Sequence, residues 1–417
     1  MNTLDGTGDT VTFQLTRPDP RYERLFPWLV PAHTVTAATF ADDWNDHPWL
    51  SGGPFVFEGY EKTSAPETLP GLLHFSRNNN YWEYDEDGNQ LPYLDGIEMQ
   101  VYSPASDSAT PLSSFNAQSV DVMLPYLIYP SDTGSLGDPD QEGFALGQSW
   151  DTLYEVIGFE MRDTRFDVNP DSLNAELLYR RAVLSAIDRN AISNDTGFPV
   201  ATSIVGTAAP GLDLDVWQQY DDTTRTGDLL GRLGAASGRD FSADPPTAVY
   251  TSSPGDETIA IGDAVVAQLV TAGWDATTNY TWDFFNINLP EGQNDIFALR
   301  LFSGDGLPEL ASQLSAFDPT LPNDQILFDW SSVGGPAQRY ADIVAEAQTT
   351  LDPDRLRDLV VEAETILADN AVVYPIVRRQ MSLAPYWPDR IQGFVPHQGW
   401  NTANAARWWS PEGARRN

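Results

Sequence analysis

Residues 51–61 read SGGPFVFEGYE, residues 72–82 read LLHFSRNNNYW and residues 91–102 read LPYLDGIEMQVY. Apolar and polar side chains alternate in each segment, which is the period of a half-buried β-strand. Phe55 and Phe57, for example, fall on the same face. The three consecutive asparagines predict a turn, because short amide side chains bond to nearby backbone. The stretch therefore predicts three strands joined by turns, followed by a short helix.

The composition bounds the class of protein. With 417 residues the chain is too long for one simple core, and we expect two or three domains. The formal net charge is −37, and Lys62 is the only lysine among the 23 basic residues. Such a surface repels nucleic acid, so the phosphate attraction that drives DNA binding is missing. The favoured interpretation of this acidic surface is that it keeps the protein soluble in high salt. Attraction of cationic ligands is the second interpretation.

Several kinds of site are excluded by residue type. The chain has no cysteine, which excludes disulfides, thiolate metal sites and cysteine nucleophiles. No apolar run is long enough to span a membrane, and residues 1–30 lack the pattern of a signal peptide. The four histidines are scattered without the spacing of a zinc site. We therefore expect no metal and no cofactor.

The remainder of the chain predicts an α/β protein. Residues 247–280 form a strand, a helix and a second strand, and a crossover of this length implies that the two strands are parallel. Residues 126–150 predict a long surface loop, because Gly, Pro, Asp and Ser are frequent there. Further periodic segments predict strands at 154–159, 295–302 and 372–377, a helix at 177–192 with Asn174 as its cap, and two helices within 334–368.

The order of the first motifs resembles a known family. GGPF at 52–55, NNNYW at 78–82, PYLDGIE at 92–98 and SVDV at 119–122 are similar to the signature region of the family 5 extracytoplasmic solute-binding proteins. These are the oligopeptide, dipeptide and nickel receptors of ABC importers. The resemblance implies a two-lobed fold in the type-II periplasmic-binding style, with lobes joined by crossing strands. We predict a first lobe of residues 1–158 plus 378–417 and a second lobe of residues 159–377.

The same resemblance implies a function and a location. The protein would capture a peptide or similar small solute between its lobes and deliver it to a membrane permease, as a monomer and without chemical conversion. The strand TVTFQL at 10–15 resembles one that normally lies well inside such a chain. We therefore expect this sequence to be a fragment of an extracytoplasmic protein, with a further segment and a secretion signal upstream.

Four residues are expected to line the ligand site. In the oligopeptide branch of the family a tryptophan and, after the next strand, an acidic residue line the cleft, and here these are Trp282 and Asp305. The acidic residue pairs with the amino terminus of a peptide. Phe302 stands where the family often has tryptophan, and Trp400 is a further wall candidate. The competing interpretations are a core aromatic for Trp282 and a turn residue for Asp305.

The enzymatic alternative is a secreted carbohydrate-active hydrolase. Such an enzyme needs only a pair of carboxylates, and the chain has 60 acidic residues and 13 tryptophans suited to stacking on sugars. No motif selects a particular pair. Motifs for phosphate binding, for a Gly-x-Ser-x-Gly nucleophile and for Ser-x-x-Lys chemistry are absent from the sequence.

The ligand assignment gives a first prediction. Replacing Asp305 with Asn should weaken binding of a peptide with a free amino terminus by one to two orders of magnitude, since a charge-assisted contact contributes about 1.5–3 kcal/mol. Isothermal titration calorimetry of both proteins measures the change. Equal affinities would remove Asp305 from the site.

Overall fold

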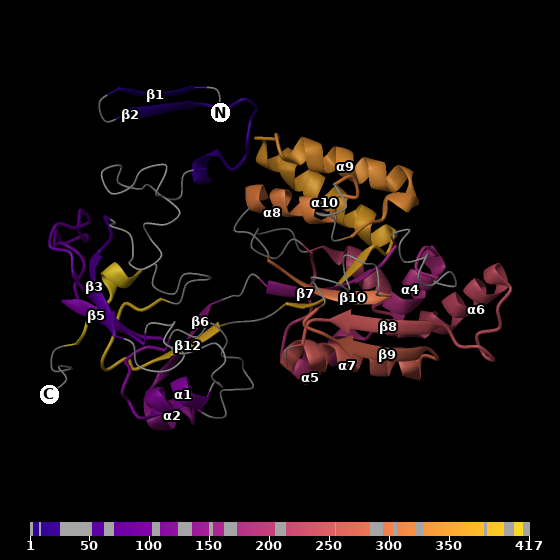
Figure 1. Ribbon diagram of the computed structural model, residues 1–417, viewed down its shortest axis with the longest axis horizontal. Helices are drawn as coiled ribbons and strands as arrows, with labels where there is room; N and C mark the ends of the chain where they lie inside the picture. The colour runs from indigo at the N-terminus through magenta and orange to yellow at the C-terminus, as the bar shows by residue number, and fades with distance from the viewer. Residues whose placement is uncertain are drawn as a thin grey trace. The chain divides into compact units, whose positions relative to one another are not determined.

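The computed structural model describes residues 3–7, 10–25, 52–61, 71–101, 109–123, 136–149, 153–161, 173–204, 214–254, 256–283, 295–302, 307–321, 328–378, 382–395 and 404–411. The chain divides into two compact units (Figure 1). The large unit comprises Met1–Leu25 and Thr152–Arg379, and the small unit comprises Phe26–Asp151 and Gln380–Asn417. These units differ from the predicted lobes mainly in residues 1–25, which group with the large unit. The lobe assignment stays a prediction.

A five-stranded mixed sheet forms the centre of the large unit, in the order β11-β7-β10-β8-β9. The strands are β7 (Leu153–Phe159), β8 (Thr247–Ser252), β9 (Asp275–Tyr280), β10 (Ile296–Phe302) and β11 (Val373–Arg378). β8 pairs in parallel with β9 and with β10, whereas β7 pairs antiparallel with β10 and β11. The parallel pairing predicted for residues 247–280 is confirmed, and the three other predicted strands are present.

Helices cover both faces of this sheet. Figure 1 shows α7 and α5 on one side of the strands and α9 and α10 on the other. Tyr250 and Ile296 are paired and share a face, while Phe297 lies on the opposite face. All three are buried, as strands covered on both sides require. The helices are α4 (Leu177–Ala186), α5 (Arg189–Thr196), α6 (Thr226–Ser237), α7 (Asp256–Thr271), α8 (Leu307–Gln313), α9 (Gly335–Ala347) and α10 (Pro353–Asp369).

The prediction of one continuous helix at 177–192 is wrong, because the structure has two helices there. α4 ends at Ala186, and Ile187 is extended with ψ 111°. α5 then begins at Arg189, because the side chain of Asp188 accepts a hydrogen bond from the amide of Ala191 and caps the new helix. Asn174 is not a cap. It is buried, and its side-chain amide donates to the carbonyls of Glu160 and Asp295.

The N-terminal residues of the large unit form a hairpin of β1 (Thr3–Thr7) and β2 (Thr10–Gln14). Only the second of these strands was predicted. Further along, the guanidinium of Arg21 donates to the hydroxyl of Ser312 in α8 at 3.0 Å. This contact ties the N-terminal segment to the large unit.

The small unit contains the three strands expected from the opening motifs. β3 (Phe55–Glu61), β4 (Leu72–Arg77) and β5 (Gly96–Gln100) form an antiparallel sheet in chain order. The rings of Phe57 and Phe75 meet edge to face across β3 and β4. The predicted asparagine turn is confirmed, because Asn78 accepts from the amide of Asn80 and donates to the carbonyl of Gly53.

A second layer of the small unit joins distant parts of the chain. β6 (Ala145–Ser149) pairs antiparallel with β12 (Ser382–Tyr386), and the predicted short helix is α1 (Ala109–Asn116). Phe115 of α1 stacks on Trp387 with ring centroids 4.9 Å apart. The prediction of a loop over 126–150 is wrong in its described part, which also holds α2 (Pro139–Glu142). Composition missed these elements because each is only four or five residues long.

Aromatic rings pack closely against Gly158 of β7, and this packing predicts that a methyl group added there destabilises the protein. A Cβ at Gly158 would overlap the ring of Phe328, which is buried and stacked on Phe317. Gly158→Ala should therefore lower the free energy of unfolding by about 1–3 kcal/mol. Gly231→Ala is the control: it lies in α6 with open space around it, and should raise stability by about 0.5–1 kcal/mol. Chemical denaturation measures both; a neutral Gly158→Ala would contradict the tight packing.

Candidate functional site

One edge of the five-stranded sheet gathers the carboxyl ends of four of its strands. β8, β9 and β10 are mutually parallel, so they end at the same edge. β7 begins there, since Leu153 pairs with Phe302, and β11 ends there, since Arg378 pairs with Tyr154. Ligands of open α/β sheets bind just outside the carboxyl ends of the strands. We call this the carboxyl edge of the sheet.

The carboxyl edge is stepped. Tyr250 pairs with Ile296, and Ser252, at the end of β8, pairs with Tyr280, at the end of β9. β8 and β9 therefore end level with Ala298, while β10 continues for four more residues. At roughly 3.3 Å per residue the step is about 13 Å high. The longer side of the step consists of β10, β7 and β11.

Trp282, predicted to line the ligand site, follows β9 by two residues at the low side of the step. Its side chain is 79% exposed, so it is not part of the core. The hydroxyl of Tyr280, just before it, donates to Asp263 and to the carbonyl of Ile259 in α7. Burial, and then the hydrogen bond to the negatively charged Asp263, raise the pKa of Tyr280 and keep its hydroxyl protonated. The strand end that carries Trp282 is thereby fixed to a helix.

Of the other predicted site residues, the structure describes only the backbone position of Phe302. Phe302 is the last residue of β10, and its backbone position puts it at the carboxyl edge. Asp305 and Trp400 lie outside the described residues. The structure thus brings two of the four predicted positions to one edge of one sheet, and the ligand site itself stays a prediction.

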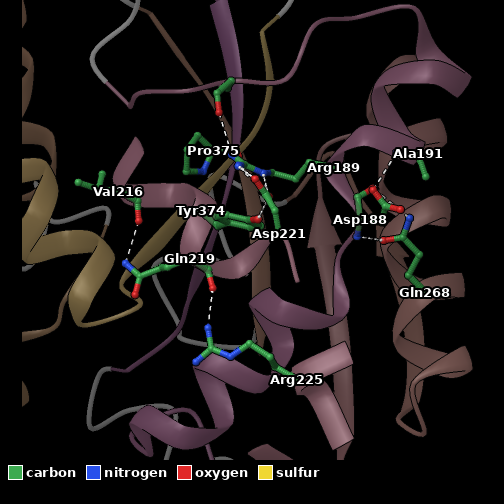
Figure 2. Close-up of polar contacts among 11 residues, drawn as sticks. Asp188, Arg189, Ala191, Val216, Gln219, Asp221, Arg225, Gln268, Tyr374 and Pro375 are labelled. Carbon is green, nitrogen blue, oxygen red and sulfur yellow. Dashed lines mark hydrogen bonds and ion pairs between the residues drawn. The ribbon is translucent and has the colours of Figure 1, made fainter. Parts of the chain in front are cut away.

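The side chain of Arg189, which is buried, binds β11, the outer strand of the sheet, whose last residue lies at the carboxyl edge (Figure 2). Arg189 is 2% exposed and makes a two-pronged ion pair with Asp221, both N–O distances being 2.8 Å. The same guanidinium donates to the carbonyls of Ala201 and Pro375 at 2.8 and 2.9 Å. It also lies over the ring of Tyr374, 4.5 Å from the centroid.

The Arg189 contacts coincide with an irregularity in β11. The register with β7 shifts between Pro375 and Val377, which leaves an extra residue in the strand. The carbonyl of Pro375 at this bulge accepts from Arg189. Tyr374 donates its hydroxyl to Asp221 at 2.8 Å, and burial raises the pKa of that hydroxyl, so it stays a donor. The network satisfies a polar backbone group at a distorted point of the sheet.

The segment of residues 199–201 binds the end of β11 along the edge that does not pair with β7. The amide of Ala201 donates to the carbonyl of Ile376, and the amide of Arg378 donates to the carbonyl of Pro199. Val200 and Val377 form an antiparallel bridge. Arg378 therefore stands at the carboxyl edge on a backbone fixed on both sides. Burial lowers the pKa of its guanidinium, which nevertheless stays charged at neutral pH.

Sequence reasoning did not find the Arg189 network. From the sequence alone, Arg189 falls only within the helix predicted at 177–192. Asp188 instead caps α5, and its backbone exchanges hydrogen bonds with the side chain of Gln268. The true partner, Asp221, is 32 residues further on. No periodic pattern connects the two positions, so only the folded chain reveals the pair.

Other chemistry is limited in the part of the chain that the structure describes. No group of three His, Asp or Glu side chains there could hold a metal ion. Glu364 accepts hydrogen bonds from Ser203 and from the indole of Trp217, but all three side chains are buried and out of reach of a substrate. No helix of the described residues is long and apolar enough to cross a membrane. The carboxyl edge is therefore the candidate site.

The profile of the bacterial extracellular solute-binding proteins, family 5 Middle, matches residues 4–318. Among solved structures, the periplasmic EDTA-binding protein EppA is 18% identical with a TM-score of 0.73, covering 99% of this chain and 76% of EppA. The oligopeptide-binding protein AppA from Bacillus subtilis, in complex with a nonapeptide, is 16% identical with a TM-score of 0.65, covering 99% and 78%. The substrate-binding protein CtaP from Listeria monocytogenes is 16% identical with a TM-score of 0.73, covering 98% and 78%. No curated protein sequence matches.

At these low identities the solved structures support a conclusion about the fold alone. They confirm the predicted fold class. All three are binding proteins, and this chain shares their mixed α/β fold. The profile match begins before the opening motifs and runs past both Trp282 and Asp305. The resemblance seen in short sequence motifs therefore extends over most of the chain.

The Arg189 network predicts a large loss of stability from one substitution. Arg189→Gln should lower the free energy of unfolding by about 3–5 kcal/mol, because it breaks a buried ion pair and leaves two carbonyls without their donor. Arg225→Gln, which removes an exposed guanidinium bonded to the carbonyl of Gln219, should change it by less than about 0.5 kcal/mol (Figure 2). Urea denaturation followed by circular dichroism compares the two. Similar losses in both variants would contradict a special role for Arg189.

Proposed function

Because this chain belongs to the bacterial extracellular solute-binding proteins of family 5, we propose that it is the substrate-binding component of an ABC importer. It captures a peptide or similar small solute and delivers it to a membrane permease. The profile match over residues 4–318 carries this proposal. Likeness in fold to the B. subtilis oligopeptide-binding protein AppA, solved with a nonapeptide, supports a peptide as the solute.

The carboxyl edge of the sheet is the surface where the solute binds. Trp282 offers an exposed ring beside the end of β9, and Phe302 ends β10 on the longer side of the step. Solute sites combine apolar and aromatic walls with a few fixed polar groups, and the strand ends supply both kinds of group. Asp305, three residues after Phe302, supplies the carboxylate for an amino terminus. The positions of Trp282 and Phe302 at this edge support their assignment to the site.

The protein works outside the cytoplasm and binds its solute without chemical conversion. The family is one of extracellular binding proteins, and its partner is a permease rather than nucleic acid, which the net charge of −37 would repel. The hydrolase alternative gains no support from the described residues, where the buried Ser203 and Glu364 are closed to substrate. We propose that the receptor acts as a monomer.

Capture of a peptide tests the function directly. The purified protein is incubated with a mixture of short peptides, washed and unfolded, and the released molecules are identified by mass spectrometry. We expect intact peptides to be retained, with no cleavage products. Retention of no peptide, or turnover of glycans or peptides, would overturn the proposal.

Two matched tryptophan variants test whether the captured peptide binds beside the end of β9. Trp282 and Trp82 are both largely exposed, at 79% and 73%. Trp282→Ala should weaken binding of the retained peptide about tenfold, the loss expected for one aromatic contact of about 1.4 kcal/mol. Trp82→Ala, in the small unit, should leave the affinity unchanged. Equal affinities of Trp282→Ala and the parent protein would move the site away from β9.

A further inference from the structure

β9 is an outer strand of the five-stranded sheet, and the exposed ring of Trp282 follows its end by two residues. In the described part of the sheet, β9 pairs with β8 alone. An outer strand has ladder hydrogen bonds along only one of its sides, whereas an inner strand has them along both. The end of β9 therefore needs a second attachment if it is to hold a side chain in one place.

A tyrosine supplies that attachment. The hydroxyl of Tyr280, the last residue of β9, donates to Asp263 at 2.8 Å and to the carbonyl of Ile259 at 3.0 Å, both in α7. A hydroxyl has a single proton, so the two oxygens share it. The carboxylate is the stronger acceptor because it is charged. α7 thus binds the carboxyl end of β9, while the turn at Gly273 joins the same helix to the start of the strand.

The contact is possible because α7 has no side chain at residue 262. A Cβ at Gly262 would lie 2.5 Å from the hydroxyl oxygen of Tyr280 and 2.5 Å from the ring of Tyr250, which is too close for either. The surface of the helix therefore has a gap that lets the hydroxyl of Tyr280 approach. A glycine inside a helix costs about 1 kcal/mol relative to alanine, and the packing of two tyrosines gives a reason for it here.

The backbone on either side of Trp282 is fixed as well. The amide of Thr281 donates to the carbonyl of Ser252, at the end of β8, at 3.0 Å. The amide of Asp283 donates to the hydroxyl of Thr281 at 3.1 Å. Trp282 therefore presents a largely exposed ring from a backbone that is bonded before and after it. A group that is held in place before binding loses little freedom when a ligand arrives, and this favours affinity.

From these contacts we infer that Tyr280 and Asp263 are positioning residues of the receptor: their contact fixes the ring of Trp282 at the carboxyl edge, and the affinity for the solute depends on it. The inference rests on the proposed function. It adds residues that act through Trp282 rather than by touching the solute. It also gives α7 a role in binding besides covering the sheet.

The position of the ring is measured without any ligand. The protein is labelled with fluorotryptophan, and the fluorine NMR signal of Trp282 is the one that disappears in Trp282→Phe. We expect Tyr280→Phe to move this signal by more than its linewidth, because the strand end is released from α7. Tyr93→Phe is the matched control, since it removes a hydroxyl that donates to the carboxylate of Asp85 in the small unit, and it should leave the signal unchanged. An unchanged signal in Tyr280→Phe would overturn the inference.

A double-mutant cycle tests whether Tyr280 acts through Trp282. The probe is the peptide that the parent protein retains in the capture experiment, and calorimetry measures its affinity. Tyr280→Phe alone should weaken binding about three- to tenfold, the range that one hydrogen bond implies. In the Trp282→Ala background the same change should have no further effect, because the ring that it positions is gone. Equal losses in the two backgrounds would show a general structural role and overturn the inference.

The acceptor is tested by a conservative change. Asp263→Asn keeps an oxygen that can accept the tyrosine proton, so it should bind the peptide more tightly than Asp263→Ala. The reverse order would contradict the role of Asp263. Thermal unfolding of each variant checks that it is folded.

The outcomes separate the inference from the function on which it rests. An unmoved fluorine signal or additive losses of affinity, with peptide still captured by the parent protein, would overturn the positioning role and leave the receptor function in place. Capture of no peptide by the parent protein would overturn the proposed function, and with it the dependence of affinity on Tyr280.

Discussion

The pairing of β7 between β10 and β11 is the constraint from which the large unit is built. β7 reaches β10 over seven residue pairs and β11 on its other side, although more than 130 residues of chain lie between β7 and β10. Both pairings are antiparallel, so the start of β7 meets the ends of its two neighbours. The carboxyl edge exists because of this arrangement. Without β7 in this position, Phe302 and Arg378 would have no common edge.

A buried cation, Arg189, supports that arrangement at the bulge in β11. β11 carries a bulge between Pro375 and Val377, and a bulge leaves backbone groups outside the ladder. Arg189 supplies a donor to the carbonyl of Pro375, while Asp221 compensates its charge. A buried ion pair is costly to desolvate, and it is stable here because nearly every N–H group of the guanidinium has an acceptor. The shape of the edge thus depends on a residue that is itself buried.

Much of the fold was predictable because the signals are local. The alternation around Phe57 and Phe75 requires only neighbouring residues, and so does the crossover from β8 through α7 to β9. The failures have equally physical causes. Asp188 looks like one more polar position in a continuous helix, yet its side chain caps α5 and ends the periodicity. β6 and β12 are too short to show a period, and each is stabilised by the other.

The sequence alone determined the family, the α/β class and the residue types available for binding, because these depend on composition, on local periodicity and on the order of short motifs. It also predicted that Trp282 and Phe302 line one site, and both positions follow or end strands at the carboxyl edge. Only the tertiary structure decided which strand ends meet, that Arg189 is buried beside Asp221, and that Arg378 ends a strand at the same edge. The reason is that strand order and buried ion pairs join residues far apart in the chain, and such long-range pairings leave no periodic signal in the sequence.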